Sequence, residues 1–130
     1  MASYWKVRVY VRANGNCPFD DWKLTNEIRN ESARIKAKIA IIQLVDATQV
    51  MPVMYVEKYR NSNLWEMKFQ GSKLRALCLL DLATKEITVL NGACKAGGGK
   101  GKGRIPQGDI DAAENLRNEI LNGQGTFKDG

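Results

Sequence analysis

Three short apolar segments follow one another in the second half of the chain, and they restrict the possible fold more than any other feature. Residues 64–70, 74–81 and 86–94 each have the length and apolar content of a β-strand. Turn residues Gly71-Ser72 and the short stretch 82–85 lie between them. Because links this short connect strands that run in opposite directions, the three segments predict an antiparallel meander.

The first half of the chain predicts one further strand and a helical region. Residues 4–11 alternate between apolar and polar side chains, which is the period of a half-buried strand. Residues 18–28 begin with a proline and two acidic residues, as helices often do. Asn30 could cap a second helix ending near Thr48, because isoleucines recur on one helical face. The pattern fits either two helices or one bent helix, followed by an extended connector over residues 51–55.

The last third of the chain contains a glycine-rich stretch, a helix and a tail. Residues 96–103 alternate glycine with lysine and predict a mobile basic loop, whereas residues 106–121 have helical spacing. We therefore expect an α+β fold of order β-α-α-β-β-β-α, with helices packed on one face of a small antiparallel sheet. One domain would span residues 1–122, and the glycine-rich residues 123–130 would form a flexible tail.

Positive charge is concentrated in two parts of this 130-residue chain, whose net charge is +6. Residues 58–75 contain five cations and one acid, Glu66, and residues 95–104 contain four cations and no acid. A positive surface attracts phosphate groups and raises the association rate of polyanions. The distribution of charge therefore favours a nucleic-acid partner.

The residue types that are missing exclude several kinds of chemistry. The chain has no histidine, which excludes a Ser-His-Asp triad, a Cys-His pair and histidine metal ligands. Its three cysteines lack the CxxC spacing of a zinc site, so we expect neither a metal nor another cofactor. No apolar run is long enough to cross a bilayer, and the first residues lack the pattern of a signal peptide. We expect a cytoplasmic protein without membrane contact.

Four short motifs occur in a characteristic order and spacing. They are Leu64-Trp65-Glu66-Met67-Lys68, Leu74-Arg75-Ala76-Leu77, Cys94-Lys95, and Ile105-Pro106 with Asp109-Ile110-Asp111-Ala112-Ala113. With the order of elements, they resemble the phage-derived branch of the RelE/HigB toxins of type II toxin-antitoxin systems. The resemblance covers most of the chain. It implies an mRNA endoribonuclease (mRNA interferase) that acts on the translating ribosome and is held inactive by a cognate antitoxin protein.

The resemblance also assigns roles to basic residues. It places Lys68, Arg75 and Lys95 at catalytic positions, where cations would stabilise charge on the scissile phosphate. The cations near them are candidate RNA contacts: Lys58, Lys73, Lys100, Lys102 and Arg104. Structural roles are open alternatives, because Lys68 could form a cross-strand ion pair with Glu66, and Arg75 could pair with Glu66 or Asp81. The glycine-lysine loop could equally be a solvated linker.

Two other functions stay open at this point. Many family members carry a tyrosine or histidine near the end of the chain that assists catalysis, and here neither residue occurs after Tyr59. This favours a noncatalytic protein of the same fold that binds nucleic acid or a host protein. A third class, a protein that blocks a host factor by protein contact alone, would need no cluster of cations.

Overall fold

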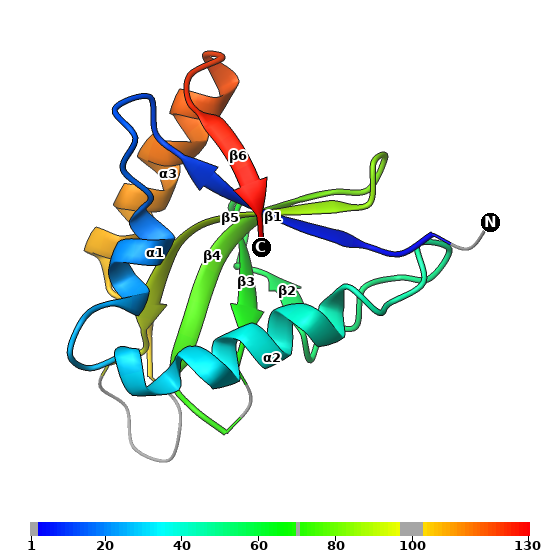
Figure 1. Cartoon of the computed structure of the whole chain (residues 1–130), viewed down its shortest axis with the longest axis horizontal. Helices are drawn as coiled ribbons and strands as arrows, with labels where there is room; N and C mark the ends of the chain where they lie inside the picture. The colour runs from blue at the N-terminus through cyan, green and yellow to red at the C-terminus, as the bar shows by residue number, and fades with distance from the viewer. Residues whose placement is uncertain (1–2, 70, 97–102) are drawn as a thin grey trace.

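The computed structural model describes residues 3–69, 71–96 and 103–130, and its elements are shown in Figure 1. In this part of the chain, no helix is both long and apolar enough to span a bilayer. The elements, in chain order, are β1 (Lys6–Val11), α1 (Pro18–Lys23), the 3-10 helix η1 (Arg29–Glu31), α2 (Ser32–Ile42), β2 (Val56–Lys58), β3 (Trp65–Lys68), β4 (Leu74–Asp81), β5 (Glu86–Cys94), α3 (Gln107–Leu121) and β6 (Thr126–Asp129).

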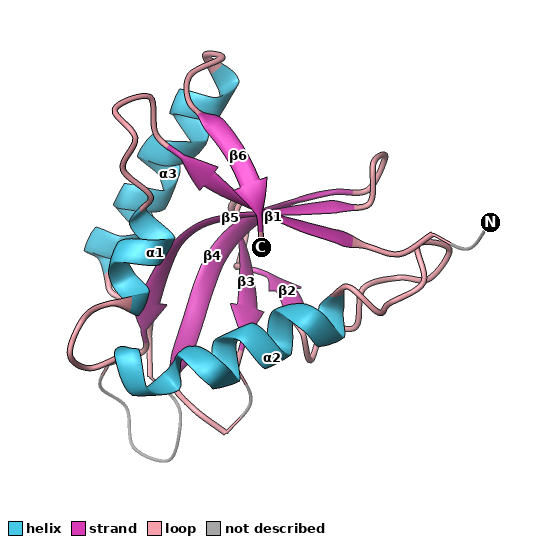
Figure 2. Cartoon of the chain, viewed as in Figure 1, coloured by secondary structure: helices cyan, strands magenta, loops and turns pink. Residues whose placement is uncertain are grey.

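The strands form one mixed sheet of six strands in the order β2-β3-β4-β5-β1-β6. The predicted meander is confirmed as β3, β4 and β5, which pair antiparallel, and the predicted first strand is confirmed as β1. Strand β1 pairs in parallel with β5 and antiparallel with β6. Figure 2 shows the strands fanning out across the molecule, as in a strongly twisted sheet. The α+β class is therefore correct, but the prediction of an antiparallel sheet is wrong, because β1 pairs in parallel with β5.

The helices cover both faces of the sheet, so the prediction that they pack on one face is wrong. Ala76 and Cys78 of β4 belong to a buried cluster with residues of α1 and α2, whereas Leu77 between them belongs to a second cluster with α3. Successive strand residues point to opposite faces. Because β4 and β5 are apolar on both sides, each face needs a cover, and α3 supplies the second one.

The end of the chain is ordered, which corrects the prediction of a flexible tail over residues 123–130. Strand β6 pairs with β1 from Val11↔Thr126 to Arg8↔Asp129. Gly123 and Gly125 adopt positive φ angles of 75° and 72° in the preceding turn, a conformation that favours glycine. The same glycines that suggested disorder therefore form the turn that returns the chain to the sheet.

The helical region is shorter than its sequence pattern predicts, and it contains two separate helices. Helix α1 ends at Lys23 rather than near Ile28, and α2 ends at Ile42 rather than near Thr48. Residues 51–55 are also not an extended connector. The backbone N–H groups of Tyr55 and Val56 donate to the carbonyl of Pro52, at 2.9 and 3.1 Å, and this turn leads directly into β2.

Helix α1 approaches β5 closely at Gly92. A Cβ atom at this position would lie only 1.8 Å from Cδ2 of Trp22. Trp22 also stacks against the buried Phe19, with 5.8 Å between their ring centroids. No sequence pattern singled out Gly92, which provides the space that lets α1 pack on the sheet.

Candidate functional site

Four charged residues of β2, β3 and β4 lie together on the face of the sheet that α3 partly covers. Lys68 is directly opposite Arg75, Glu66 is opposite Leu77, and Glu57 of β2 is opposite Glu66. Because alternate strand residues share a face, these four side chains share the face of Leu77, whose buried cluster includes α3. We call Glu57, Glu66, Lys68 and Arg75 the charged patch.

Arg75 is held in place by a carboxylate and by two backbone carbonyls. Its Nε donates to Oε1 of Glu66 at 3.2 Å, and its Nη1 donates to the carbonyl oxygens of Ser72 at 3.1 Å and Leu74 at 2.7 Å. The Arg75 and Glu66 side chains are only 13% and 10% exposed. Within the described residues, Nη2 of Arg75 has no hydrogen-bond partner. The N–H groups of Nη2 are thus the part of this fixed guanidinium that could donate to a ligand.

Lys68 also has a carboxylate partner, but in a more open position. Its Nζ lies 2.8 Å from Oε1 of Glu57, and the two side chains are 25% and 48% exposed. An exposed pair of this kind contributes only about 0–1 kcal/mol. A phosphate can therefore compete with Glu57 for Lys68 at little energetic cost.

Three more of the candidate cations lie where β4 begins and β5 ends. The backbone N–H of Lys95 donates to the carbonyl of Lys73 at 2.9 Å, directly after the last strand pair, Leu74↔Cys94. Ala93, two residues before Lys95, is opposite Arg75. The backbone N–H and carbonyl groups of Arg104 and Ala96 are hydrogen-bonded to each other, at 2.8 and 3.0 Å. Arg104 therefore lies next to the end of β5, close to Lys95 in the fold. The structure therefore brings Lys73, Lys95 and Arg104 to the end of the sheet where the charged patch lies.

The remaining RNA-contact candidates are not part of this group. Lys100 and Lys102 lie outside the described residues. Lys58 ends β2 and lines a cleft of about 660 Å³ at the opposite end of β4, together with Arg8 and Arg117. Arg8 and Arg117 did not stand out in the sequence, because one lies in the first strand and the other in the last helix.

A buried amide next to α3 was also missed. Asn91 of β5 donates from Nδ2 to the carbonyl oxygen of Asp109 at 3.2 Å, in the first turn of α3. Its Oδ1 is buried and has no hydrogen-bond partner among the described residues. Burial raises the pKa of the Asp109 carboxyl above its usual value. A polar residue inside the apolar segment 86–94 was the available signal in the sequence.

The arrangement supplies fixed and movable cations at one edge of an open sheet surface. Arg75 can donate to an anionic oxygen from a set position, while the half-buried Lys68 and the exposed Lys73 can neutralise neighbouring phosphates. No family model, curated protein or solved structure matches this chain.

Proposed function

We propose that this protein binds single-stranded RNA on the charged patch and cleaves it, as the toxin of a toxin-antitoxin pair acting on mRNA in the translating ribosome. The observation that carries the proposal is the register of β3 and β4, in which Lys68 is opposite Arg75 on an incompletely covered face. Lys73, which precedes β4, and Lys95, which follows β5, lie at the adjacent end of the sheet. In this proposal the partners are mRNA, the ribosome and a cognate antitoxin protein.

The proposed reaction is an attack of the RNA 2′-OH on its adjacent phosphate. The 2′-oxygen forms a bond to phosphorus as the bond to the 5′-oxygen of the next nucleotide breaks. The 2′-OH loses its proton and the leaving oxygen gains one, which gives a cyclic phosphate and a 5′-OH end. Cations stabilise the charge that develops on the phosphorus oxygens. Arg75 is suited to this role because Glu66 and two carbonyls already fix its orientation.

The test is expression of the protein without its partner, followed by measurement of growth and of transcript ends. The wild-type protein should arrest growth and shorten mRNA within translated frames. Arg75→Lys and Lys95→Ala should each lower the cleavage rate by a factor of about 10² to 10³, the usual cost of removing one oriented charge donor. Lys36→Ala, on the exposed side of α2, is the matched control and should keep full activity.

Two outcomes would contradict this proposal. Intact transcript ends together with normal growth would exclude the cleavage activity. Full toxicity of a folded Arg75→Lys variant would show that arginine serves only as a partner of Glu66, because a simple ion pair tolerates lysine.

A noncatalytic protein that binds nucleic acid is the second candidate function. It is favoured by the carboxylate partners of both central cations, Glu66 for Arg75 and Glu57 for Lys68. This candidate predicts salt-dependent RNA binding without any new transcript ends.

A further inference from the structure

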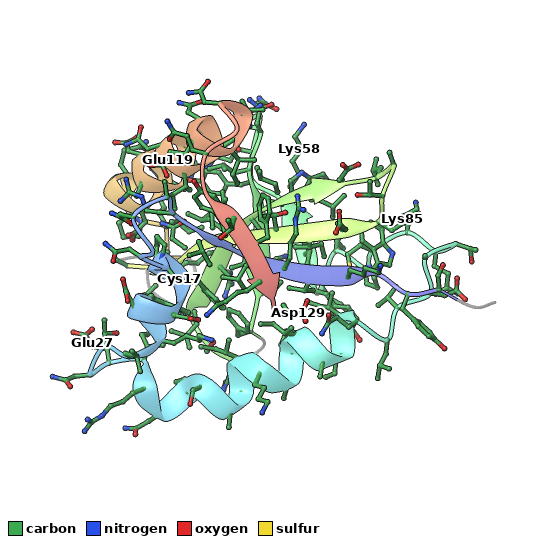
Figure 3. All side chains as sticks on the ribbon, turned by 45° about the horizontal axis from the view of Figure 1, so that its top comes forward. Cys17, Glu27, Lys58, Lys85, Glu119 and Asp129 are labelled. Atoms are coloured by element: carbon green, nitrogen blue, oxygen red, sulfur yellow. The ribbon has the colours of Figure 1, made fainter. Side chains whose placement is uncertain are left out.

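Tyr59 and Arg60 follow β2, and Tyr59 lies on the face of the sheet that carries the charged patch. The backbone N–H of Tyr59 donates to the carbonyl of Leu64 at 2.9 Å, which continues the pairing of β2 with β3 by one residue. Leu64 belongs to the buried cluster under α3, and the Tyr59 ring packs against that cluster. Lys58, the residue before Tyr59, lies beside the end of α3 (Figure 3). Tyr59 therefore lies at the margin of the area that α3 covers.

The Tyr59 ring is held in place, and part of it stays accessible. The carbonyl oxygen of Tyr59 accepts hydrogen bonds from the backbone N–H of Ser62 at 3.1 Å and from its hydroxyl at 2.6 Å. The residue is half-buried, and its own hydroxyl has no hydrogen-bond partner within the described residues. No part of the proposed cleavage reaction uses this aromatic ring.

Arg60 has a strained backbone and a loosely held side chain. Its φ angle of 49° lies in the left-handed region, which is unfavourable for residues other than glycine. Strained positions of this kind cluster at binding sites. The exposed Arg60 side chain has no salt bridge in the part of the chain that the structure describes. Its guanidinium carbon lies 5.4 Å from the centroid of the Tyr59 ring, compared with 3.7 Å for Arg8 over Phe127.

An aromatic ring with a planar guanidinium above it fits a flat ligand. In single-stranded RNA the bases are free to stack, and proteins bind them on aromatic rings and on arginine guanidinium planes. Leu64, the backbone partner of Tyr59, is four residues from Lys68, which is about 13 Å at about 3.3 Å per residue. A strand with a phosphate at Lys68 can therefore continue along β3 to Tyr59.

We propose that Tyr59 and Arg60 form a binding site for one base of the RNA strand that lies on the charged patch. The base stacks on the Tyr59 ring, and the Arg60 guanidinium moves outward and closes over the base. Arg60 can move because no salt bridge among the described residues holds it. The identity of the ligand as RNA rests on the proposed function.

The experiment measures the binding of oligoribonucleotides that carry 2′-O-methyl groups, because a blocked 2′-oxygen cannot attack the phosphate. The fluorescent base 2-aminopurine is placed at one position of the strand at a time. Anisotropy gives the affinity, and the loss of 2-aminopurine fluorescence reports stacking on an aromatic ring. Oligonucleotides too short to span about 13 Å are the length control. Circular dichroism confirms that each variant is folded.

Tyr59→Leu removes the aromatic ring and keeps an apolar side chain, whereas Tyr59→Phe keeps the ring. In the wild type, one position of the strand should lose more fluorescence on binding than the others. Tyr59→Leu should abolish that extra loss and weaken the binding of long strands about 5- to 150-fold, the usual effect of removing one stacked base. Tyr59→Phe should behave as the wild type. The shortest strands should bind equally well to all three proteins.

Arg60→Gly and Lys85→Gly form a matched pair. Lys85 also has a positive φ angle, 57°, and its ammonium also lies 5.4 Å from an aromatic ring, that of Trp5. Trp5 is only 1% exposed and belongs to the cluster under α1 and α2. Both variants should unfold at the same denaturant concentration as the wild type or at a higher one, because glycine relieves the strain. Only Arg60→Gly should weaken RNA binding, by about two- to fivefold.

The outcomes separate this proposal from the proposed function. If Lys68→Ala weakens RNA binding and Tyr59→Leu does not, the stacking site is refuted and the charged patch is kept. Equal loss of fluorescence at every strand position would also overturn the stacking site. Absence of RNA binding by the wild type would refute both proposals. Binding that depends on Tyr59, by a protein that leaves transcripts intact, would refute the nuclease and support the stacking site.

Discussion

The two faces of the sheet differ in how completely they are covered. Among the described residues, the cluster under α1 and α2 contains eighteen buried apolar side chains, and the cluster under α3 contains nine. Helix α3 lies over β4 and β5, and the strands β2 and β3 beside it present the charged patch on the same face. The two faces of the sheet therefore have different roles. Substitutions on the face of α1 and α2 should change folding, and those on the open part of the other face should change binding.

The largest expected effect is on the face of α1. Gly92→Ala would place a methyl group 1.8 Å from the Trp22 ring, so α1 would have to move away from β5. Overpacking of this kind costs about 1–3 kcal/mol, and we expect a value near the top of that range. Denaturant unfolding followed by tryptophan fluorescence measures this loss of stability.

Gly108→Ala is the control for this substitution. Its Cβ would meet no atom within 4 Å, and it lies in α3, where alanine is favoured over glycine. The variant should be as stable as the wild type or up to about 1 kcal/mol more stable. If Gly92→Ala unfolds at the same denaturant concentration as the wild type, the close contact between α1 and β5 does not determine stability.

A smaller effect distinguishes the two ion pairs of the charged patch. Glu66→Gln removes the carboxylate from a nearly buried Arg75 and should lower stability by about 1–3 kcal/mol. Glu57→Gln removes the partner of the more exposed Lys68 and should cost about 0–1 kcal/mol. The two variants carry the same chemical change, so each is the other's control. Equal free energies of unfolding for the two variants would show that burial does not make the Arg75–Glu66 pair more stabilising than the Lys68–Glu57 pair.

The last expected effect, of about 1 kcal/mol, concerns the link between β1 and α3. Tyr10 donates from its hydroxyl to Oε1 of Glu119 at 2.9 Å, and Arg12 lies 2.8 Å from Oε2 of the same carboxylate. Burial, and then the hydrogen bond to Glu119, raise the pKa of Tyr10 above its usual value. The folded state therefore holds the Tyr10 hydroxyl proton more tightly than the unfolded state. The contribution of Tyr10 to folding stability is complete below about pH 10, the usual pKa of tyrosine. It is lost as the pH rises through the higher pKa of Tyr10 in the folded state.

Tyr10→Phe should therefore cost about 1 kcal/mol at neutral pH and remove this part of the alkaline loss of stability. The measurement is the free energy of unfolding as a function of pH for the wild type and the variant. Parallel curves above pH 10 would show that Tyr10 does not contribute to the alkaline transition.

Long periodic segments were predictable from the sequence, and short or distant pairings were not. The segments that became β1, β3, β4 and β5 each carry their own apolar pattern. Strands β2 and β6 lie in segments that carry no such pattern. The run Leu77-Cys78-Leu79-Leu80 did contain the signal for a sheet covered on both faces, because a strand buried on both sides reads as continuously apolar.

The sequence predicted which residues form the candidate site, but it did not predict which of them form ion pairs with one another. The sequence left the partner of Arg75 open between Glu66 and Asp81, and the structure selects Glu66. Lys68 pairs with Glu57 rather than with Glu66, because the unpredicted strand β2 adds to the edge of the sheet. The cleft at Lys58 depends on Arg8 and Arg117, which no local pattern connects.

The position of β1 between β5 and β6 has a consequence for how the chain folds. Arg8 and Thr88, joined across β1 and β5, are 80 residues apart, and Asp20 and Lys128, joined between α1 and β6, are 108 residues apart. Contacts between such distant residues slow folding, since a long loop must close before they form. The first strand therefore waits for partners from the last third of the chain. Until they arrive, both of its edges can pair with another molecule, so the nascent protein is exposed to aggregation for longer than a helical protein of its size.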